Sequence, residues 1–387
     1  MLEGKKERLQ SGLLQGLTVL DFSHYLPGPF ATLRLSEMGA KVIKVEPLSG
    51  DPARSTDPQM NGSGIVFEAN NLRKKSVTLN LKHETGREIA LGLIQEADVL
   101  IESFRPGVMK KLGLGYEEVL AVNPKLIYCS ISGYGQDGML SGLGSHDINY
   151  MALSGTLAQL KNESGKPVHP SNTFADFIGG MAANERILAG LVSRGLTGRG
   201  SYHSISITEV MASFMVNHII VEKETGAENG INVLGGTVVS YSLYETKEGR
   251  FVSLGALEPK FWNHFCQGVG RPDWIPAQFS VQSMDNYVYR EITELFKSRN
   301  LEEWIEFGMK TDCCLAPVLE TRELAKHPYF LEKGSVLSGG QVRMHSGILA
   351  EEWTAAPEKG EHTEKVLKDL LKASDSELLA WRNAGII

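Results

Sequence analysis

Residues 16–46 read GLTVLDFSHYLPGPFATLRLSEMGAKVIKVE, and this stretch decides the fold class. It begins with GLTVLDFS, a short apolar run with β-branched residues that is typical of a buried strand. PGPFATLRLSEMG has its apolar residues at helical spacing and ends in Gly39, a residue type that commonly stops helices. AKVIKVE is strand-like again. The stretch therefore predicts a strand, a helix and a second strand.

The same alternation continues toward the middle of the chain. SVTLNL, DVLIESF and KLIYCSIS are strand-like, whereas ETGREIALGLIQEA and GYEEVLAVNP have helical patterns. Residues 176–196 predict one long helix before the turn TGRG. Strands that alternate with helices favour an α/β fold with a mostly parallel, doubly wound sheet.

The texture changes after Glu222, where the sequence becomes polar and rich in glycine, as in a linker or the rim of a site. YSLYETKEGRFVSLGAL then predicts a hairpin with Glu248-Gly249 at its turn. Two helical stretches follow, around Lys260–Gly268 and Tyr289–Lys310. Because 387 residues are too many for one ordinary core, we expect two domains.

Bulk properties exclude several classes of protein. The formal net charge of −7 argues against nucleic acid or an anionic membrane as the main partner, although a local basic pocket still permits a polyanionic ligand. The start, MLEGKKERLQ, is charged, and the chain has no run of about 18 uncharged apolar residues, so we expect neither a signal peptide nor a membrane span. Four cysteines without metal-ligand spacing favour reduced thiols in a cytoplasmic protein: Cys129, Cys266, Cys313 and Cys314.

GYGQDG, residues 133–138, matches the GxGxxG pattern of dinucleotide sites and follows a strand. A dinucleotide fingerprint opens a helix, whereas MLSGLGS follows here without helical spacing. The glycines are better explained as bends that let the loop pass a ligand or another backbone segment. The chain also has no Walker loop, HExxH or GxSxG motif, so we expect no metal site and no redox cofactor.

Two acid–base residues occur at positions suited to a ligand, and a third stands at the end of a strand. His146 lies in SHDINY, after the glycine-rich loop at a strand end, and histidine suits proton transfer near neutral pH. Asp176 starts the long helix; it is either an ordinary N-cap or a functional group on a helix start that Gly179 and Gly180 open to a ligand. Glu258 ends a strand before a proline and by itself indicates little.

Basic residues gather at strand ends or in the loops between strands. Such residues are usually solvated surface, but several at one sheet edge would suit a ligand with several phosphates. They are Lys44, Arg73, Lys74, Lys75, Lys82 and Arg105.

The chain resembles the family III CoA-transferases and racemases over nearly its whole length. The matching pieces include LPGPFATLRLSEMGAKVIKVEP, ADVLIESFRPGV, NPKLIYCSISGYGQDG, HDINYMALSG, ADFIGGM, GALEPKFW and DCCLAPVL. The resemblance implies a large Rossmann-like domain built from both termini, a smaller α+β domain and two chains interlocked as a homodimer. The implied boundaries are 1–206 with 340–387 for the large domain, 207–240 for a linker, 241–330 for the small domain and 331–339 for the return linker.

The resemblance also implies an acyl-CoA substrate, with CoA present only as part of the thioester. Its expected contacts are Lys44, Leu79, Asn80, Leu81, Lys82, Arg105, Ser145, Asp147, Tyr150 and Asn172. HDINY, ALSG and the pair Asn172 and Asp176 are similar to the α-methylacyl-CoA racemases. In those enzymes the residues matching His146 and Asp176 are the two acid–base groups, and the glutamate matching Glu258 supports the histidine.

The transferase branch remains open, since there the aspartate matching Asp176 is a nucleophile that forms an acyl anhydride. Three departures from the racemase pattern concern the acyl substrate more than the chemistry. Ser145 replaces a glycine, Gly235 stands where racemases tend to have an aspartate, and the basic residue expected just after Glu46 is missing.

Overall fold

The computed structural model describes residues 12–162, 164–227, 230–336, 340, 342 and 354–387. The chain divides into two compact units, Met1–Met215 with Lys333–Ile387, and Val216–Glu332. Residues 1–11, which carry the expectation about a signal peptide, and parts of the expected return segment lie outside the described residues. The expected linker 207–240 contains two helices: α9 (Ile207–Ser213) belongs to the first unit and α10 (Val216–Thr225) to the second.

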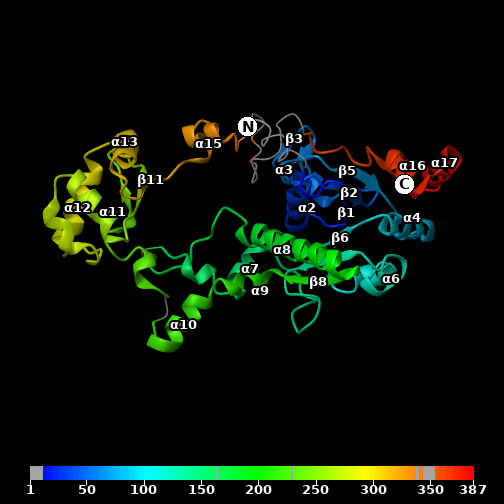
Figure 1. Ribbon diagram of the computed structural model, residues 1–387, viewed down its shortest axis with the longest axis horizontal. Helices are drawn as coiled ribbons and strands as arrows, with labels where there is room; N and C mark the ends of the chain where they lie inside the picture. The colour runs from blue at the N-terminus through cyan, green and yellow to red at the C-terminus, as the bar shows by residue number, and fades with distance from the viewer. Residues whose placement is uncertain (1–11, 163, 228–229, 337–339, 341, 343–353) are drawn as a thin grey trace. The chain divides into compact units, whose positions relative to one another are not determined.

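The first unit is built on a parallel sheet of six strands in the order β5-β2-β1-β6-β7-β8 (Figure 1). The strands are β1 (Thr18–Asp21), β2 (Lys41–Glu46), β5 (Lys75–Thr78), β6 (Val99–Glu102), β7 (Ile127–Ser132) and β8 (Ser201–Ser206). The chain passes from β1 through β2 to β5 and then returns to β6, on the other side of β1. The strand order therefore reverses between β1 and β6, and the prediction of a doubly wound α/β sheet is confirmed.

Helices cover both faces of this sheet because each strand is apolar on both sides. Val19 of β1 packs in one core layer with α2, α8 and α9, whereas Leu20 packs in the other with α4, α6, α16 and α17. The helices are α2 (Pro27–Glu37), α3 (Ile65–Asn70), α4 (Glu84–Gln95), α5 (Val108–Lys111), α6 (Tyr116–Val122), α7 (Asp147–Leu153), α8 (Phe174–Thr197), α9, α16 (Thr363–Leu371) and α17 (Asp375–Asn383). The short elements are η2 (Pro52–Ser55), β3 (Gln59–Met60), β4 (Ser63–Gly64) and η3 (Leu157–Gln159).

The C-terminal segment completes the edge of the sheet beside β5. The His362 N–H donates to the Ser76 carbonyl at 2.9 Å, and the Thr363 hydroxyl accepts the Thr78 N–H at 3.1 Å. Beyond the strand, the Asn80 N–H donates to the Ile386 carbonyl at 2.8 Å. The large domain is therefore built from both ends of the chain.

The second unit has an antiparallel sheet in the order β11-β10-β9, and its elements are α10, η4 (Asn232–Gly235), β9 (Tyr241–Glu245), β10 (Phe251–Gly255), α11 (Pro259–Gly268), η5 (Pro272–Ala277), α12 (Tyr287–Lys297), α13 (Leu301–Thr311), β11 (Leu315–Pro317), α14 (Thr321–Leu324) and α15 (Pro328–Lys333). The expected hairpin is β9–β10, and Gly249 at its turn has a φ of 75°, which favours glycine. The prediction of one helical stretch around Tyr289–Lys310 is wrong. The stretch forms two helices because Asn300 caps α13 in a capping box with Glu303.

No helix in the described part of the chain combines the length and apolarity that a membrane span requires.

Candidate active site

The glycine-rich loop after β7 is shaped by close packing. A Cβ on Gly133 would clash with the Tyr150 ring and the Ser145 hydroxyl, so only glycine fits there. The Thr208 hydroxyl and N–H both donate to the Gly133 carbonyl, at 2.8 and 3.0 Å. The loop opens no helix until α7 begins at Asp147. It therefore lacks the helix start that holds a pyrophosphate in dinucleotide sites.

His146 occupies the N-cap position of α7 and is exposed. Its backbone N–H donates to the Asn149 side chain at 3.0 Å, which fixes the turn into the helix. Ser145, the residue before it, has its hydroxyl 2.6 Å from where a Cβ on Gly133 would lie. Because Gly133 directly follows β7, His146 lies close to the carboxyl end of β7, the edge where doubly wound sheets bind ligands.

Asp176 lies in the first turn of α8 and is joined to α7 through Asp147. The Asp147 carboxylate is buried and accepts the Asp176 backbone N–H at 3.0 Å. The interpretation of Asp176 as the N-cap is wrong, because α8 begins at Phe174 and its N-cap is Thr173. Among the described residues, no hydrogen bond to the Asp176 carboxylate is found, which leaves this group available to a ligand.

Burial raises the pKa of the Asp176 carboxyl from 3.8 to about 7, and the negative charge of Asp147 adds to the effect. Both causes disfavour the ionised form. A carboxyl with this pKa exists in both protonation states at neutral pH, so it can act as an acid or as a base.

Ser145 and Tyr150 bind each other beside this pair. The Tyr150 hydroxyl donates to the Ser145 carbonyl at 3.1 Å, and the Ser145 hydroxyl donates to the Tyr150 oxygen at 3.2 Å. Burial raises the pKa of Tyr150. Asn172 is exposed just before α8. The structure thus gathers Ser145, His146, Asp147, Tyr150, Asn172 and Asp176 on α7, on α8 and in the segments just before them.

The glycines in the first turns of α8 pack against protein. A Cβ on Gly180 would lie 2.6 Å from the Pro27 carbonyl oxygen, and one on Gly179 would lie 2.8 Å from Ile207. The interpretation that these glycines let a ligand come close is therefore wrong. They allow α8 to press against α2 and α9, which fixes the position of Asp176.

The expected CoA contacts lie along the same carboxyl edge of the sheet with different degrees of exposure. Arg105, after β6, is exposed, and its Nη2 would lie 3.0 Å from a Cβ on Gly144, so the guanidinium reaches the loop that leads to His146. Lys82, after β5, is also exposed. Leu81 is half-buried.

Leu79 and Asn80 are occupied within the protein. The Leu79 side chain is buried in the core. The Asn80 amide donates to the Gly385 carbonyl at 3.3 Å and its oxygen accepts the Lys82 N–H at 3.2 Å. Of the segment 79–82, Lys82 is thus the exposed residue.

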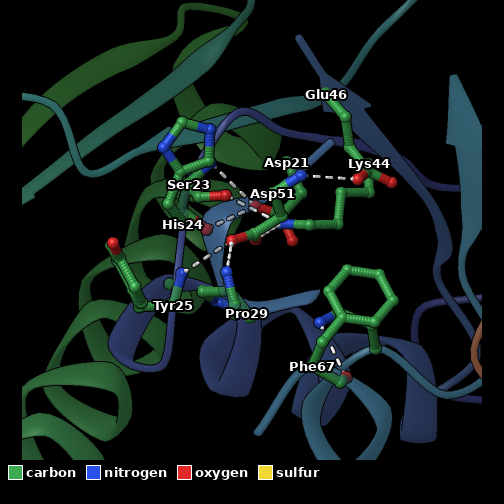
Figure 2. Close-up of polar contacts among 12 residues, drawn as sticks. Asp21, Ser23, His24, Tyr25, Pro29, Lys44, Glu46, Asp51 and Phe67 are labelled. Atoms are coloured by element: carbon green, nitrogen blue, oxygen red, sulfur yellow. Dashed lines mark hydrogen bonds and ion pairs between the residues drawn. The ribbon is translucent and has the colours of Figure 1, made fainter. Parts of the chain in front are cut away.

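Lys44 does not fit its expected role as a phosphate ligand, because its side chain is completely buried. Figure 2 shows its ammonium among acidic side chains: it pairs with Asp51 at 2.9 Å and donates to the Ser23 carbonyl at 2.7 Å. Although burial alone would lower it, the charges of Asp21 and Asp51 raise the pKa of Lys44. Lys44 therefore belongs to an internal ion cluster and presents no charge to solvent.

We call this group the ion cluster and define it as Asp21, Lys44, Asp51 and Lys74. Lys74 pairs with Asp21 at 3.0 Å, and although burial opposes ionisation, Lys44 and Lys74 hold the pKa of Asp21 well below its usual range. Sequence reasoning missed this cluster. The available signal was Asp21, a charged residue at the end of an otherwise apolar strand.

Glu102, at the end of β6, was also missed. It is buried, its carboxylate accepts the Phe104 N–H at 2.8 Å, and burial raises its pKa to about 7. It stabilises the turn that leads to Arg105.

Glu258 belongs to the second unit, where it is exposed at the N-cap position of α11. In the described part of the chain, no group of three histidine, cysteine or acidic side chains could hold a metal ion.

A histidine and a carboxyl of raised pKa at the ligand edge of a doubly wound sheet are residue types that suit acid–base or carboxylate chemistry. The model of CoA-transferase family III matches residues 14–363, and the chain belongs to this family of enzymes. Both racemases and CoA-transferases are among its relatives.

The chain is 34% identical to the alpha-methylacyl-CoA racemase of Homo sapiens, over 92% of this chain and 93% of that protein. It is 29% identical to the succinyl-CoA:glutarate CoA-transferase of Homo sapiens, over 97% and 90%. A CAIB/BAIF family protein from Brucella suis is similar in fold, with a TM-score of 0.81, 24% identity and coverage of 93% and 100%. The Rv3272 structure from M. tuberculosis has a TM-score of 0.78, 27% identity and coverage of 92% and 99%.

Proposed function

We propose that the protein is a racemase of 2-methylacyl-CoA thioesters, which removes the proton next to the thioester carbonyl and returns it to the opposite face. The observation that carries this proposal is the carboxyl of Asp176, whose pKa is raised to about 7 by burial and by Asp147. Such a carboxyl can both remove and return a proton at neutral pH. A nucleophilic carboxylate, by contrast, has to be ionised before it attacks.

His146 supplies the second acid–base group. Inversion needs proton transfer on both faces of a planar enolate, so two groups have to flank the α-carbon. His146 is the N-cap of α7, and Asp147, the next residue, accepts the Asp176 N–H of α8, which couples the positions of the two groups. In this mechanism one of His146 and Asp176 takes the α-proton while the other donates a proton from the opposite side.

The enolate oxygen has to be stabilised by fixed donors. Each well-placed donor contributes about 3–4 kcal/mol to transition-state stabilisation. The start of α8 offers peptide N–H groups. They lie at the positive end of the helix dipole, which favours negative charge. The Asp176 N–H already binds Asp147 and is not one of these donors.

The second candidate is a CoA-transferase in which Asp176 forms a covalent acyl intermediate. The match to a succinyl-CoA:glutarate CoA-transferase over 97% of the chain supports it. An acceptor acid would then be a second substrate, and His146 would have no proton to transfer.

We also propose an interlocked homodimer. The support is helix α10, which has no buried residue and exposes Val216, Ile219 and Ile220 at helical spacing. Exposed apolar groups of this kind mark surfaces that another chain covers.

Incubation of 2-methylbutanoyl-CoA in D₂O, with and without an acceptor acid, tests the proposal. We expect one deuterium at the α-carbon and loss of stereochemical purity. His146→Ala and Asp176→Ala should each abolish racemisation, because inversion needs both faces served, while one of them can still exchange the α-proton of a single epimer. His169→Ala, at another exposed histidine of the first unit, is the control and should leave the rate unchanged.

The opposite outcome is equally specific. If hydroxylamine traps an acyl group on Asp176 and CoA moves to the added acid without α-deuteration, the protein is a transferase.

A further inference from the structure

Tyr25, directly after β1, has a strained backbone. Its φ is 61°, in the left-handed region that bulky residues rarely adopt. The side chain is 51% exposed, and in Figure 2 it extends away from the ion cluster. Exposure means that core packing does not require a tyrosine here. Strain that the surrounding structure maintains at an exposed aromatic residue points to a function.

The ion cluster fixes the backbone on both sides of Tyr25. Asp51 accepts the Tyr25 N–H at 3.3 Å and the Ala53 N–H at 2.9 Å. Lys44 donates to the Ser23 carbonyl at 2.7 Å, and Lys74 donates to the Pro29 carbonyl at 2.9 Å. These buried side chains thus hold the turn before Tyr25 and the start of the helix after it.

The turn also lies where the strand order reverses. The His24 N–H donates to the Ser103 hydroxyl at 2.9 Å. The His24 ring packs edge-on against the Phe104 ring, with 5.1 Å between the ring centroids. These contacts join the loop after β1 to the loop after β6, on either side of the switch point where doubly wound sheets bind ligands.

The same loop reaches the helix that carries Asp176. Gly180 packs on the Pro27 carbonyl, and Asp176 lies one helical turn earlier on the same face of α8. Tyr25 is two residues before Pro27. The strained turn therefore lies near the first turns of α8, which carry Asp176.

We propose that the ion cluster holds the Ser23–Leu26 turn in its strained conformation in order to present Tyr25 to the thioester end of an acyl-CoA, where it determines affinity for the ester. This inference rests on the proposed acyl-CoA function and deepens it. Tyr25 is the contact, whereas Lys44, Asp51 and Lys74 are positioning residues that act through it.

Tyr25→Gly separates strain from binding, because glycine accepts this φ without a steric penalty. We expect an unchanged or higher melting temperature together with a dissociation constant for 2-methylbutanoyl-CoA at least tenfold higher by calorimetry. The effect on free CoA should be smaller. The matched control is Lys372→Gly, at an exposed helix end with a φ of 59°, which should not alter ester binding.

Asp51→Ala tests the positioning role through a double-mutant cycle. It should weaken ester binding in the wild-type background and have no further effect in the Tyr25→Gly background. If the wild type binds the ester and Tyr25→Gly binds it equally well, this inference is wrong and the proposed function stands. This comparison does not depend on Asp51→Ala and remains valid if that variant does not fold. Additive effects of the two substitutions would remove the ion cluster from the positioning role. A wild type that binds no CoA ester overturns the proposed function as well.

Discussion

Asp176→Asn should make the protein more stable at alkaline pH and leave its stability unchanged near pH 4. The folded protein favours the neutral form of this carboxyl, since burial and Asp147 raise its pKa from 3.8 to about 7. The gap of about 3 units corresponds to at most about 4 kcal/mol, at about 1.4 kcal/mol per unit. Asp176 is partly exposed, so solvent screening reduces the effect, and we expect on the order of 2 kcal/mol.

The direction follows from the raised pKa. Well below pH 3.8 the carboxyl is protonated in both the folded and the unfolded chain, so folding involves no proton uptake by this group. As the pH rises from about 3 to 7, the Asp176 carboxyl ionises in the unfolded chain but stays largely protonated in the folded protein, so its contribution to the free energy of unfolding falls. Asparagine resembles the neutral acid and removes this loss. The stability difference between variant and wild type should therefore grow from pH 4 to 7 and stay constant above.

Thermal unfolding of both proteins between pH 4.5 and 8.5 measures this difference as a gap of a few degrees in apparent melting temperature. Asp137→Asn is the matched control, because Asp137 is an exposed carboxylate on the loop before α7. Its gap from the wild type should not change with pH. A gap for Asp176→Asn that is equal at pH 5 and pH 8 would refute the reasoning.

Two further predictions concern the ligand and the assembly. Arg105→Ala should weaken CoA-ester binding several-fold or more and leave the fold intact, since charge-assisted hydrogen bonds contribute about 1.5–3 kcal/mol; unchanged affinity by calorimetry would remove Arg105 from the site. An interlocked homodimer should have no stable free monomer, so a folded monomer in sedimentation experiments at low micromolar concentration would contradict it.

The sheet could be predicted from the sequence because each of its strands is a short apolar run that stands between helical patterns. The run Lys41–Glu46, for example, is buried on both faces as its composition requires. The alternation of strands and helices predicts that the strands are parallel, but it predicts their order in the sheet only in part. The C-terminal segment beside β5 depends on hydrogen bonds such as that of Thr363 to Thr78, which no local pattern predicts.

The candidate site could be predicted as a set of residues but not as a set of roles. Lys44 and Arg105 both stand near strand ends, yet one is buried in the ion cluster and the other is exposed. Which of them pairs with a carboxylate depends on Asp51, which lies after β2 and is brought to Lys44 only by the fold. Likewise Asp147 acts on Asp176 through a contact between residues 29 positions apart.

The glycines of α8 test the claim that helix packing, rather than ligand approach, positions Asp176. Gly180→Ala would place a Cβ 2.6 Å from the Pro27 carbonyl oxygen, which is backbone and cannot swing aside. Overpacking of this kind costs about 1–3 kcal/mol of stability. Gly195→Ala, on the same helix, would meet nothing within 4 Å and should stabilise the protein by about 0.5–1 kcal/mol.

The two alanine variants should therefore shift the melting temperature in opposite directions. Gly180→Ala should also weaken ester binding, because α8 can admit the new methyl group only by moving away from α2 and taking Asp176 with it. If instead Gly180→Ala leaves stability unchanged and impairs only binding, the glycine faces the ligand and the packing argument is wrong. If both variants stabilise the protein, α2 and α8 are not in the contact that the structure shows, and the position of Asp176 must be fixed by Asp147 alone.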